Sequence, residues 1–425
     1  MKILMLGWEL PPIISGGLGV ASEGITNGMV NLGHKVEFLL PKKNRAHKNK
    51  PFKVIDSNAI SLDFKLWQKE VKVTEIIRET EVAKRLIPYL PAEVFEIARK
   101  KQIVIEKLED KQESALLDKV ELTGEYTKNL LSETSKYALL AAQHCLKNKY
   151  DIIHAHDWVV FKAGALCAKE TGLPLYVHCH STEYDRNGSY AQEDIIREEK
   201  LGFEASTKIF SVSEMVKRTI VSKYKINPKK IVVVPNALEE ELASVKKAST
   251  KKKKTIIFVG RFTHQKGPFV FVDIARELLN KGGDYEFIMI GDGYLKEQLI
   301  RKVNHLNLSD RFEFPGFLVR EKALEQLQKA DLLIAPSYAE PFGLVILEAI
   351  LNKVPVLAAK GTGISEFVPG LVQIELWDTF NFIQKASRLL KDVPYKKEVV
   401  DLCLSQASKL SWEKSAKIIE KAYAS

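Results

Sequence analysis

Cysteine is scarce in this sequence, and long apolar runs are missing from it. The 425 residues include four cysteines with no C-x-x-C pair, so free thiols in a reducing cytosol are expected rather than a disulfide framework or a zinc site. No apolar run approaches the roughly 20 residues that a membrane span needs. The apolar start is interrupted at Gly7 and Glu9, too early for a signal peptide. We therefore expect a cytoplasmic globular protein, and its length predicts two domains.

Acidic residues do not balance the basic ones, and the formal net charge is +10. Much of the excess lies in two stretches, Lys42 to Lys50 and Lys246 to Lys254. Neither contains the interleaved aromatic residues that are typical of a nucleic-acid site, so solvated loops are favoured and no nucleic-acid partner is expected. An anionic membrane surface remains an alternative partner, which would place the protein at the inner face of a membrane.

The N-terminal stretch follows a strand, loop and helix pattern. Lys2 to Leu6 predicts a buried strand, and Val20 to Leu32 predicts a helix. Between them lies Ser15-Gly16-Gly17-Leu18-Gly19, where glycines allow backbone N–H groups to approach a phosphate at a helix N-terminus. The loop is neither G-x-G-x-x-G nor a P-loop, so a tight packing turn is the alternative.

Polar residues collect where two further strands are predicted to end. The stretch 151–158 ends in H-A-H-D-W, and the stretch 175–184 ends in H-C-H-S-T-E-Y. The carboxyl ends of parallel strands are the usual location of an α/β active site, so a polar substrate site is favoured. A metal site built on the H-x-H pairs and a set of core histidines are the alternatives. We expect one histidine of each pair to point into packing.

The chain divides into two α/β halves of similar size. The first covers residues 1–245 and contains a charged, mainly helical insertion at about 65–135; the lysine-rich stretch 246–254 is the predicted linker. The second covers residues 255–400 and is followed by an amphipathic C-terminal helix within 401–425. The alternation of strands and helices predicts a parallel α/β sheet in each half.

Two basic residues flank a strand-to-helix turn early in the second half. The strand Thr255 to Gly260 is followed by Arg261 and, after a short loop, by Lys266. An arginine fork and a lysine point charge on one turn can converge on a diphosphate. Two solvated loop cations are the alternative reading.

A second turn in this half carries two glutamates. The run Leu332 to Ala335 predicts a buried strand, the turn S-Y-A-E-P-F-G follows, and a helix begins near Leu344. Glu340 lies at the strand end, and Glu348 lies about two turns along the helix, roughly 12 Å away. The helix dipole alone favours acidic residues near a helix start. The two glutamates therefore indicate a functional site only in combination with the neighbouring motifs.

Taken together, these motifs resemble the retaining GT-B glycosyltransferases of family 4, also called glycosyl transferases group 1, with glycogen and starch synthase-like features. The resemblance covers nearly the whole chain except the insertion. The motifs that carry it are, in chain order, Gly16-Gly17, His156-Asp157-Trp158, His180, Gly260-Arg261, Lys266-Gly267, Gly291-Asp292-Gly293, Glu340 with Glu348, Gly361-Thr362-Gly363 and Ser411-Trp412.

The resemblance implies two Rossmann-like domains facing across a cleft, with the acceptor held mainly by the first and a nucleotide sugar mainly by the second. The C-terminal helix of such enzymes usually crosses back to the first domain. The implied roles are as follows: Glu340, His180 and Asp157 lie at the transferring sugar; Arg261 and Lys266 bind the diphosphate; Glu348 binds the ribose; Gly16, Gly17, Phe342, Gly343 and Leu344 present backbone N–H groups to the sugar or phosphate.

The implied enzyme needs no metal and no cofactor, because the sequence contains no D-x-D and the two cations can stabilise the leaving diphosphate. Its expected partners are a nucleoside diphosphate sugar and a glycan acceptor. The N-terminal W-E-L-P-P with G-G-L-G favours an α-glucan acceptor and glucose as the sugar. Two departures weaken that assignment: Ser15 replaces the lysine of bacterial glycogen synthases, and Pro235-Asn236-Ala237-Leu238-Glu239 replaces P-N-G-V-D.

Other functions remain open at this point. A peripheral membrane enzyme that makes a glycolipid or surface polysaccharide is the alternative among transferases. A nucleotide-sugar epimerase would share the fold but need no acceptor. A non-catalytic nucleotide-sugar binding protein is the alternative from another class, although it has less need for all of Arg261, Lys266, Glu340 and Glu348.

Overall fold

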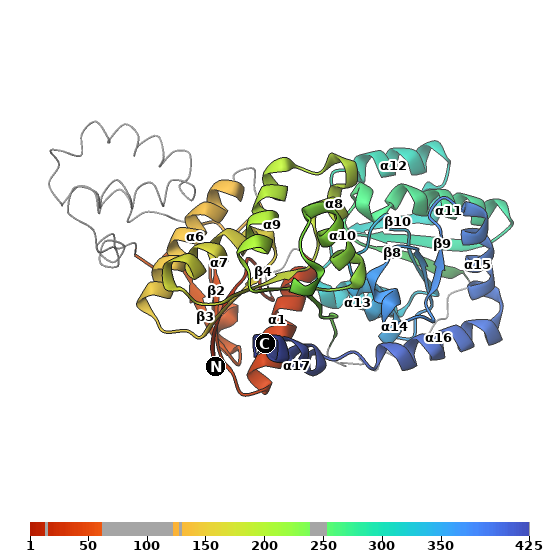
Figure 1. The fold of residues 1–425 in the computed structure, drawn as a ribbon. Helices are drawn as coiled ribbons and strands as arrows, with labels where there is room; N and C mark the ends of the chain where they lie inside the picture. Colours follow the sequence, from red (N-terminus) through yellow and green to blue (C-terminus); the bar gives the residue numbers. More distant parts are fainter. Residues whose placement is uncertain (13–15, 62–121, 127–129, 239–252, 425) are drawn as a thin grey trace, which may run out of the picture.

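The computed structural model describes residues 1–12, 16–61, 122–126, 130–238 and 253–424 (Figure 1). The predicted insertion at about 65–135 falls largely outside the described residues. Residues 246–252 of the predicted linker, together with Ser15 and Glu239, also lie outside the described residues. Figure 1 shows two sheets side by side, each covered by helices on both faces.

The first sheet is parallel throughout and has the spatial order β3-β2-β1-β4-β5-β6-β7 among the described residues. Side chains of β1 alternate between its two faces: Ile3 and Met5 join one apolar cluster and Leu4 and Leu6 the other. The strands are β1 (Lys2–Leu6), β2 (Lys35–Leu40), β3 (Lys53–Asp56), β4 (Ile152–His156), β5 (Leu175–Cys179), β6 (Lys208–Ser211) and β7 (Ile231–Val233).

The helices of the first half lie between these strands. They are α1 (Gly17–Asn31), α6 (Leu130–Lys147), α7 (Trp158–Thr171), α8 (Glu183–Asn187), α9 (Glu193–Ala205) and α10 (Glu214–Tyr224). The short 3-10 helices are η1 (Arg45–Asn49), η2 (Ser57–Ala59), η4 (Gly188–Tyr190) and η5 (Pro228–Lys230).

The second sheet is also parallel, in the order β10-β9-β8-β11-β12-β13 among the described residues. Its strands are β8 (Lys254–Val259), β9 (Tyr285–Ile290), β10 (Phe312–Gly316), β11 (Leu332–Ala335), β12 (Val356–Ala359) and β13 (Val372–Ile374). Its helices are η6 (His264–Lys266), α11 (Pro268–Asn280), α12 (Lys296–His305), η7 (Ser309–Arg311), α13 (Arg320–Gln328), α14 (Leu344–Leu351), η8 (Gly363–Glu366), α15 (Thr379–Lys391) and α16 (Val393–Ala407), and α17 (Trp412–Tyr423) follows.

The predicted fold class is confirmed: two parallel α/β sheets of GT-B type. The interior strands coincide with the apolar runs that predicted them. The edge strands β3 and β13 were not predicted, because each is short and includes polar residues, K-V-I-D and V-Q-I. The boundaries proposed for the two domains stay a prediction.

The helix α17 returns to the first half of the chain and packs against α1, as Figure 1 shows near the C-terminal label. It adds Trp412, Ala416 and Ile419 to the apolar cluster that contains Ile25 of α1. The Ser415 hydroxyl donates a hydrogen bond of 2.6 Å to the carbonyl of Pro235. The last helix therefore completes one face of the first sheet.

Close contact between α1 and α17 depends on glycine. A Cβ atom at Gly24 would lie 2.0 Å from the indole of Trp412. We expect Gly24→Ala to lower the free energy of unfolding by roughly 1–3 kcal/mol, despite the higher helix propensity of alanine, because the added methyl group overpacks this contact. Urea unfolding measures the change, and the same substitution in a Trp412→Leu background is the control. Equal costs in both backgrounds would contradict the contact.

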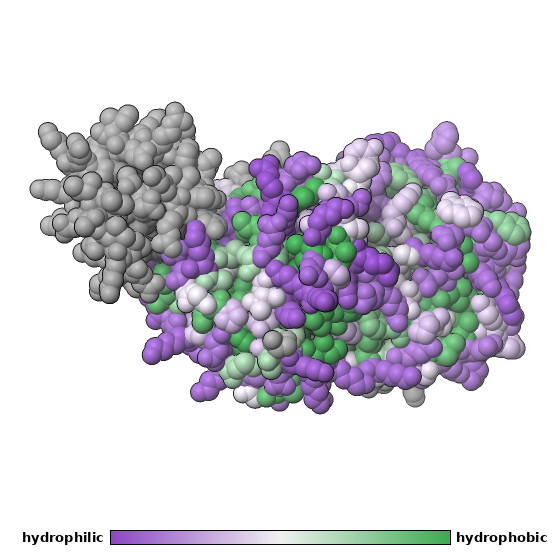
Figure 2. Space-filling view, in the orientation of Figure 1, coloured by the Kyte–Doolittle hydropathy of each residue, from purple (hydrophilic) through white to green (hydrophobic). Residues whose placement is uncertain are grey.

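Hydrophilic side chains cover most of the face shown in Figure 2, and hydrophobic ones gather near its centre, where the two halves meet. No helix among the described residues is long and apolar enough to cross a membrane.

Candidate functional site

Loops from the two sheets meet between the halves of the molecule. On the first half they follow β1, β4, β5 and β6, and on the second they follow β8, β11 and β12. Contacts join α8 to η6 and α10 to η8. The carboxyl ends of both sheets therefore face each other, which is where a ligand binds in open α/β sheets.

Glu340 lies at the centre of the loop that follows β11. Its side chain is 9% exposed, and its carboxylate accepts hydrogen bonds from Lys266 Nζ at 2.6 Å and from the Ser337 hydroxyl at 3.3 Å. Its backbone N–H donates to the carbonyl of Gly361, and its carbonyl accepts from the N–H of Gly363. The turn is thus fixed on both sides, and the predicted catalytic carboxylate directly contacts a predicted donor-binding cation.

The loop around η6 holds the two predicted diphosphate ligands. Arg261 is exposed, and its side chain has no ion pair within the described part of the chain. The stem of Lys266 passes Gly260, since Cγ lies 3.8 Å from the position of a Cβ there. Gly267 has φ +66°, and a Cβ would lie 1.9 Å from the carbonyl oxygen of Pro336, so only glycine fits this crossing. Lys266 therefore borders the Glu340 turn, and exposed Arg261 lies five positions before it on the same loop.

Two helix N-termini converge beside this turn. Gly16 precedes α1 and Gly343, at φ +105°, precedes α14, and neither glycine has a side chain to cap its helix. In the first turn of α1 the Glu9 carboxylate accepts a hydrogen bond from the N–H of Gly19 at 2.9 Å. A Cβ at Gly17 would lie 2.9 Å from Leu344 Cδ1, so the first residues of the two helices are in contact across the halves. The first N–H groups of a helix lack intrahelical partners and carry partial positive charge. The arrangement suits an anion between them.

Phe342 is buried in the same turn and packs against Phe367, with ring centroids 6.0 Å apart. Its carbonyl accepts a hydrogen bond from the N–H of Ile364 at 2.8 Å. The ring therefore anchors the turn in the core and leaves the backbone as the part of this residue that can meet a ligand.

Glu348, the predicted ribose ligand, is paired in the structure. Arg320 Nε, at the start of α13, donates to Glu348 Oε1 at 2.8 Å. The arginine side chain is the more exposed partner, 44% against 19%. Arg320 was not predicted, because the residues are 28 positions apart and meet only through the packing of α13 against α14.

On the first half, Asp157 follows β4 and has φ +68°, a conformation that costs energy for a residue with a side chain. It is buried, and burial raises the pKa of its carboxyl to about 6, against the opposing effect of nearby Arg186. His180 follows the neighbouring strand β5, and burial lowers the pKa of its imidazole to about 3. The two predicted residues thus lie at adjacent strand ends, in unusual protonation environments.

Behind Asp157 lies a buried ionic cluster that the sequence did not reveal. Arg186 donates to Glu199 at 2.6 Å and to Glu183 at 3.1 Å, and it lies 3.8 Å from Asp157. Tyr224 donates its hydroxyl hydrogen to Glu199, and burial raises the pKa of Glu199 to about 7. Three carboxylates surround one guanidinium, and this excess of negative charge favours retention of a proton by one of the carboxylates.

The prediction for the histidine pairs was wrong. His154, His156, His178 and His180 all lie on one side of the sheet, with neighbouring ring centroids 4.5 to 5.7 Å apart and ring planes within 24° of parallel. Residues two apart in a strand share a face, and β4 and β5 are adjacent in register. Tyr423 of α17 contacts this histidine stack through His154 Nδ1 at 2.5 Å.

The histidine stack also bears on the metal alternative. Ligand nitrogens of His154, His156 and His178 lie within 4.8 Å of one another. A tetrahedral site needs lone pairs that converge on one point, whereas the rings here are nearly parallel. Burial lowers the pKa of all four imidazoles, so they are neutral at pH 7. We assign no metal to them; His156 instead contacts His180 at 3.2 Å between ring nitrogens.

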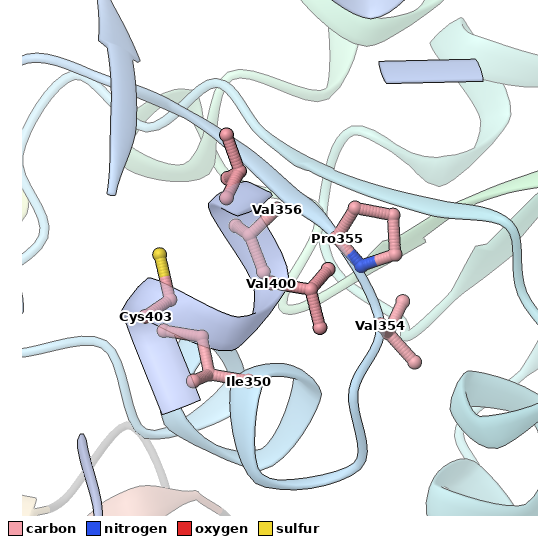
Figure 3. Close-up of a pocket in the computed structure, with 7 residues that line it drawn as sticks. Ile350, Val354, Pro355, Val356, Val400 and Cys403 are labelled. Carbon is pink, nitrogen blue, oxygen red and sulfur yellow. The ribbon is translucent and has the colours of Figure 1, made fainter. Parts of the chain in front are cut away.

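A separate apolar hollow lies between α14, β12 and α16, lined by Ile350, Val354, Pro355, Val356, Val399, Val400 and Cys403 (Figure 3). Its side chains offer no charge and no hydrogen bond to a sugar phosphate. It plays no part in the converging loops described above.

Two family models match consecutive parts of the chain: "Glycosyltransferase Family 4" over residues 118–242 and "Glycosyl transferases group 1" over residues 239–381. An uncharacterized glycosyltransferase of Methanocaldococcus jannaschii is 24% identical, covering 98% of this chain and 96% of its own length. A glycogen synthase of Mycobacterium tuberculosis is 23% identical, covering 87% of this chain and 80% of its own length.

Solved structures share the fold over the whole chain. The sucrose-phosphate synthase of Thermosynechococcus elongatus has a TM-score of 0.71 and 16% identity, covering 100% of this chain and 98% of that one. The Anabaena protein HepE, solved with UDP-glucose, has a TM-score of 0.70 and 16% identity, covering 100% of both chains.

Proposed function

Because this chain belongs to the glycosyl transferases group 1 of family 4 and transfers a sugar from a nucleotide sugar, we propose that the sugar is glucose and the acceptor an α-glucan. The convergence of Lys266, Glu340 and two helix N-termini on one turn carries the assignment of the donor site. The resemblance to glycogen synthase over 87% of the chain supports the acceptor. HepE, whose structure contains UDP-glucose, supports a uridine donor.

In the proposed reaction the bond between the sugar C1 and the diphosphate oxygen breaks, and a bond from C1 to an acceptor hydroxyl oxygen forms. The acceptor hydroxyl gives up its proton to the departing nucleoside diphosphate or to solvent, and the nucleoside diphosphate leaves. Negative charge grows on the diphosphate, where Arg261, Lys266 and the N–H groups of Gly17 and Leu344 stabilise it. Groups held in place before the reaction lower the barrier, because they stabilise this charge more in the transition state than in the bound donor.

The groups from the first half would hold the transferring sugar. Asp157 and His180 lie at adjacent strand ends, and a neutral His180 can accept or donate a hydrogen bond to a sugar hydroxyl. Glu340 would lie against the same sugar, where its negative charge favours the positive charge that builds up on the ring. Glu348 would bind the ribose, so Arg320 would have to share or release its carboxylate when the donor arrives.

Release of nucleoside diphosphate from a panel of UDP-, ADP- and GDP-sugars, with and without glycogen and in chelator, tests this function. We expect release from one glucose donor that rises with glycogen. Slow hydrolysis that glycogen does not stimulate would exclude an α-glucan acceptor, but it would leave the assignment as a glycosyltransferase in place. Silence across the panel would favour a non-catalytic nucleotide-sugar binding protein.

A second candidate acceptor is a lipid-linked or surface glycan at an anionic membrane. Exposed Lys42, Lys43, Arg45 and Lys48 around η1 form a basic patch that favours it. Sedimentation with phosphatidylglycerol vesicles separates the two candidates. Binding to the vesicles, together with transfer that glycogen does not stimulate, would replace the α-glucan proposal.

A further inference from the structure

The two halves of the molecule are joined by a polar contact next to the Glu340 turn. The helix α10 of the first half begins at Glu214, directly after β6 and Ser213. Across from it lies η8 of the second half, which ends at Glu366. The Glu366 carboxylate accepts hydrogen bonds from the backbone N–H groups of Glu214 at 2.6 Å and Met215 at 2.8 Å. A carboxylate from one half thus caps a helix of the other.

A second hydrogen bond makes this contact continuous with the predicted catalytic residue. The Ser213 hydroxyl donates a hydrogen bond to the carbonyl oxygen of Pro341 at 2.7 Å, and both residues are buried. Pro341 follows Glu340, whose carbonyl accepts from the N–H of Gly363 at the start of η8. Glu366 and the Glu340 turn therefore meet α10 as one unit.

The chemistry of the contact makes it strong yet reversible. The first N–H groups of a helix have no partner within the helix, and the partial positive charge there favours a carboxylate. Hydrogen bonds to an ionised acceptor are about twice as strong as neutral ones. The contact is polar and its side chain is 23% exposed, so water can replace each partner when the halves separate.

We propose that Glu366 is a positioning residue for sugar transfer: by capping α10 it couples the approach of the two halves to the placement of Glu340. The proposal rests on the proposed function and adds a residue to it. When the cap is made, Ser213 holds the Pro341 carbonyl, and the Glu340 carboxylate is aimed between the halves. When the cap is broken, the second half still contains Arg261, Lys266 and Glu348, so it can still bind the donor.

The test compares Glu366→Ala, Glu366→Gln and the wild type. In Glu366→Ala we expect donor turnover, measured as nucleoside diphosphate release, to fall at least roughly tenfold, with the donor KM within about twofold of wild type. The glutamine amide oxygen can still accept one of the two hydrogen bonds, so Glu366→Gln should recover part of the loss. Glu297→Ala, which removes an 87% exposed carboxylate on α12, is the matched control and should behave as wild type.

Amide hydrogen exchange measures whether Glu366 protects the N-terminus of α10, and it requires no substrate. In Glu366→Ala the amides of Glu214 and Met215 should exchange at least roughly tenfold faster, while amides of the central strand β8 stay protected. Wild-type exchange at these two amides, or wild-type turnover with a folded Glu366→Ala, overturns the proposal. A wild-type enzyme that is silent on every donor would overturn the proposed function, and the exchange result would still decide whether Glu366 joins the halves.

An independent variant changes the other side of the contact. A Cβ at Gly363 would lie 2.0 Å from the Pro341 carbonyl oxygen and 2.9 Å from Ser213 Cβ. Gly363→Ala should therefore separate Ser213 from the Glu340 turn and reproduce the loss of turnover at an unchanged donor KM. Full activity in this variant would count against the coupling.

Discussion

We expect the Glu340→Gln and Lys266→Ala variants to fold, and each to release nucleoside diphosphate roughly 10²- to 10³-fold more slowly than the wild type. This range is the usual cost of removing one preorganised charge that acts on a transition state. Glu340 Oε2 lies 2.6 Å from Lys266 Nζ, so each substitution removes half of one ion pair at the centre of the site. Glutamine keeps the size and the hydrogen-bonding capacity of Glu340 and removes its charge.

The two variants differ in their expected effect on stability. Lys266→Ala leaves the largely buried Glu340 carboxylate without its cation, which costs about 3–5 kcal/mol where such a pair is fully buried and less here, because the lysine is partly exposed. Lys360→Ala is the matched control. It breaks an exposed pair with Glu375 in the same half and should leave both turnover and stability within experimental error. Wild-type turnover in either folded site variant would refute the site.

Acid should unfold this protein through its histidine stack. Burial lowers the pKa of His154 and His180 to about 3, and it lowers those of His156 and His178 well below the usual value of an imidazole. Below about pH 6.5 these histidines bind protons in the unfolded chain but stay neutral in the native stack. Stability is therefore fully present above that pH and falls as the pH drops toward 3, by about 1.4 kcal/mol per pH unit for each histidine. Four such residues give roughly 6 kcal/mol per unit.

His178→Leu isolates one of the four. Neither ring nitrogen of His178 has a hydrogen-bond partner among the described residues, and the side chain is fully buried. Replacing it with an apolar side chain of similar size should raise the free energy of unfolding at pH 7 by roughly 1–3 kcal/mol. The dependence on pH between 6 and 4 should weaken by about 1.4 kcal/mol per unit.

Urea unfolding at pH 7, pH 6 and pH 4 measures both effects. His305→Leu, at an exposed position on α12, is the matched control for the loss of a histidine outside the stack. An unchanged dependence on pH in His178→Leu would show that the stack does not control acid unfolding.

The sequence predicted the strands and turns more completely than the contacts between them. A run such as Leu332–Ala335 is apolar at every position, so it reveals a buried strand without any knowledge of its neighbours. The edge strand β13, V-Q-I, has too few residues for such a signal. Its place is set by pairing with β12, which no local pattern records.

The same limit applies to the site. Glu340 and Lys266 were predicted because each belongs to a motif, but their ion pair joins residues 74 positions apart. Arg186 and Glu366 carry no motif that the sequence analysis recognised, and each matters because of what lies beside it in the fold. The error over the histidine pairs was of another kind. The period of two in a strand was sufficient to place both residues of each pair on one face, and it was misapplied.

The packing of α17 on α1 has a consequence for synthesis. The ribosome makes α17 roughly 380 residues after α1, so at about 5–20 residues per second the apolar face of α1 waits on the order of half a minute for its cover. During that time the surface of α1 around Gly24 and Gly28, which Trp412 and Ala416 cover in the folded protein, is accessible to chaperones or to another nascent chain. The first half cannot finish folding as it emerges, and a fragment ending before Trp412 should need the missing helix supplied as a peptide to stay in solution.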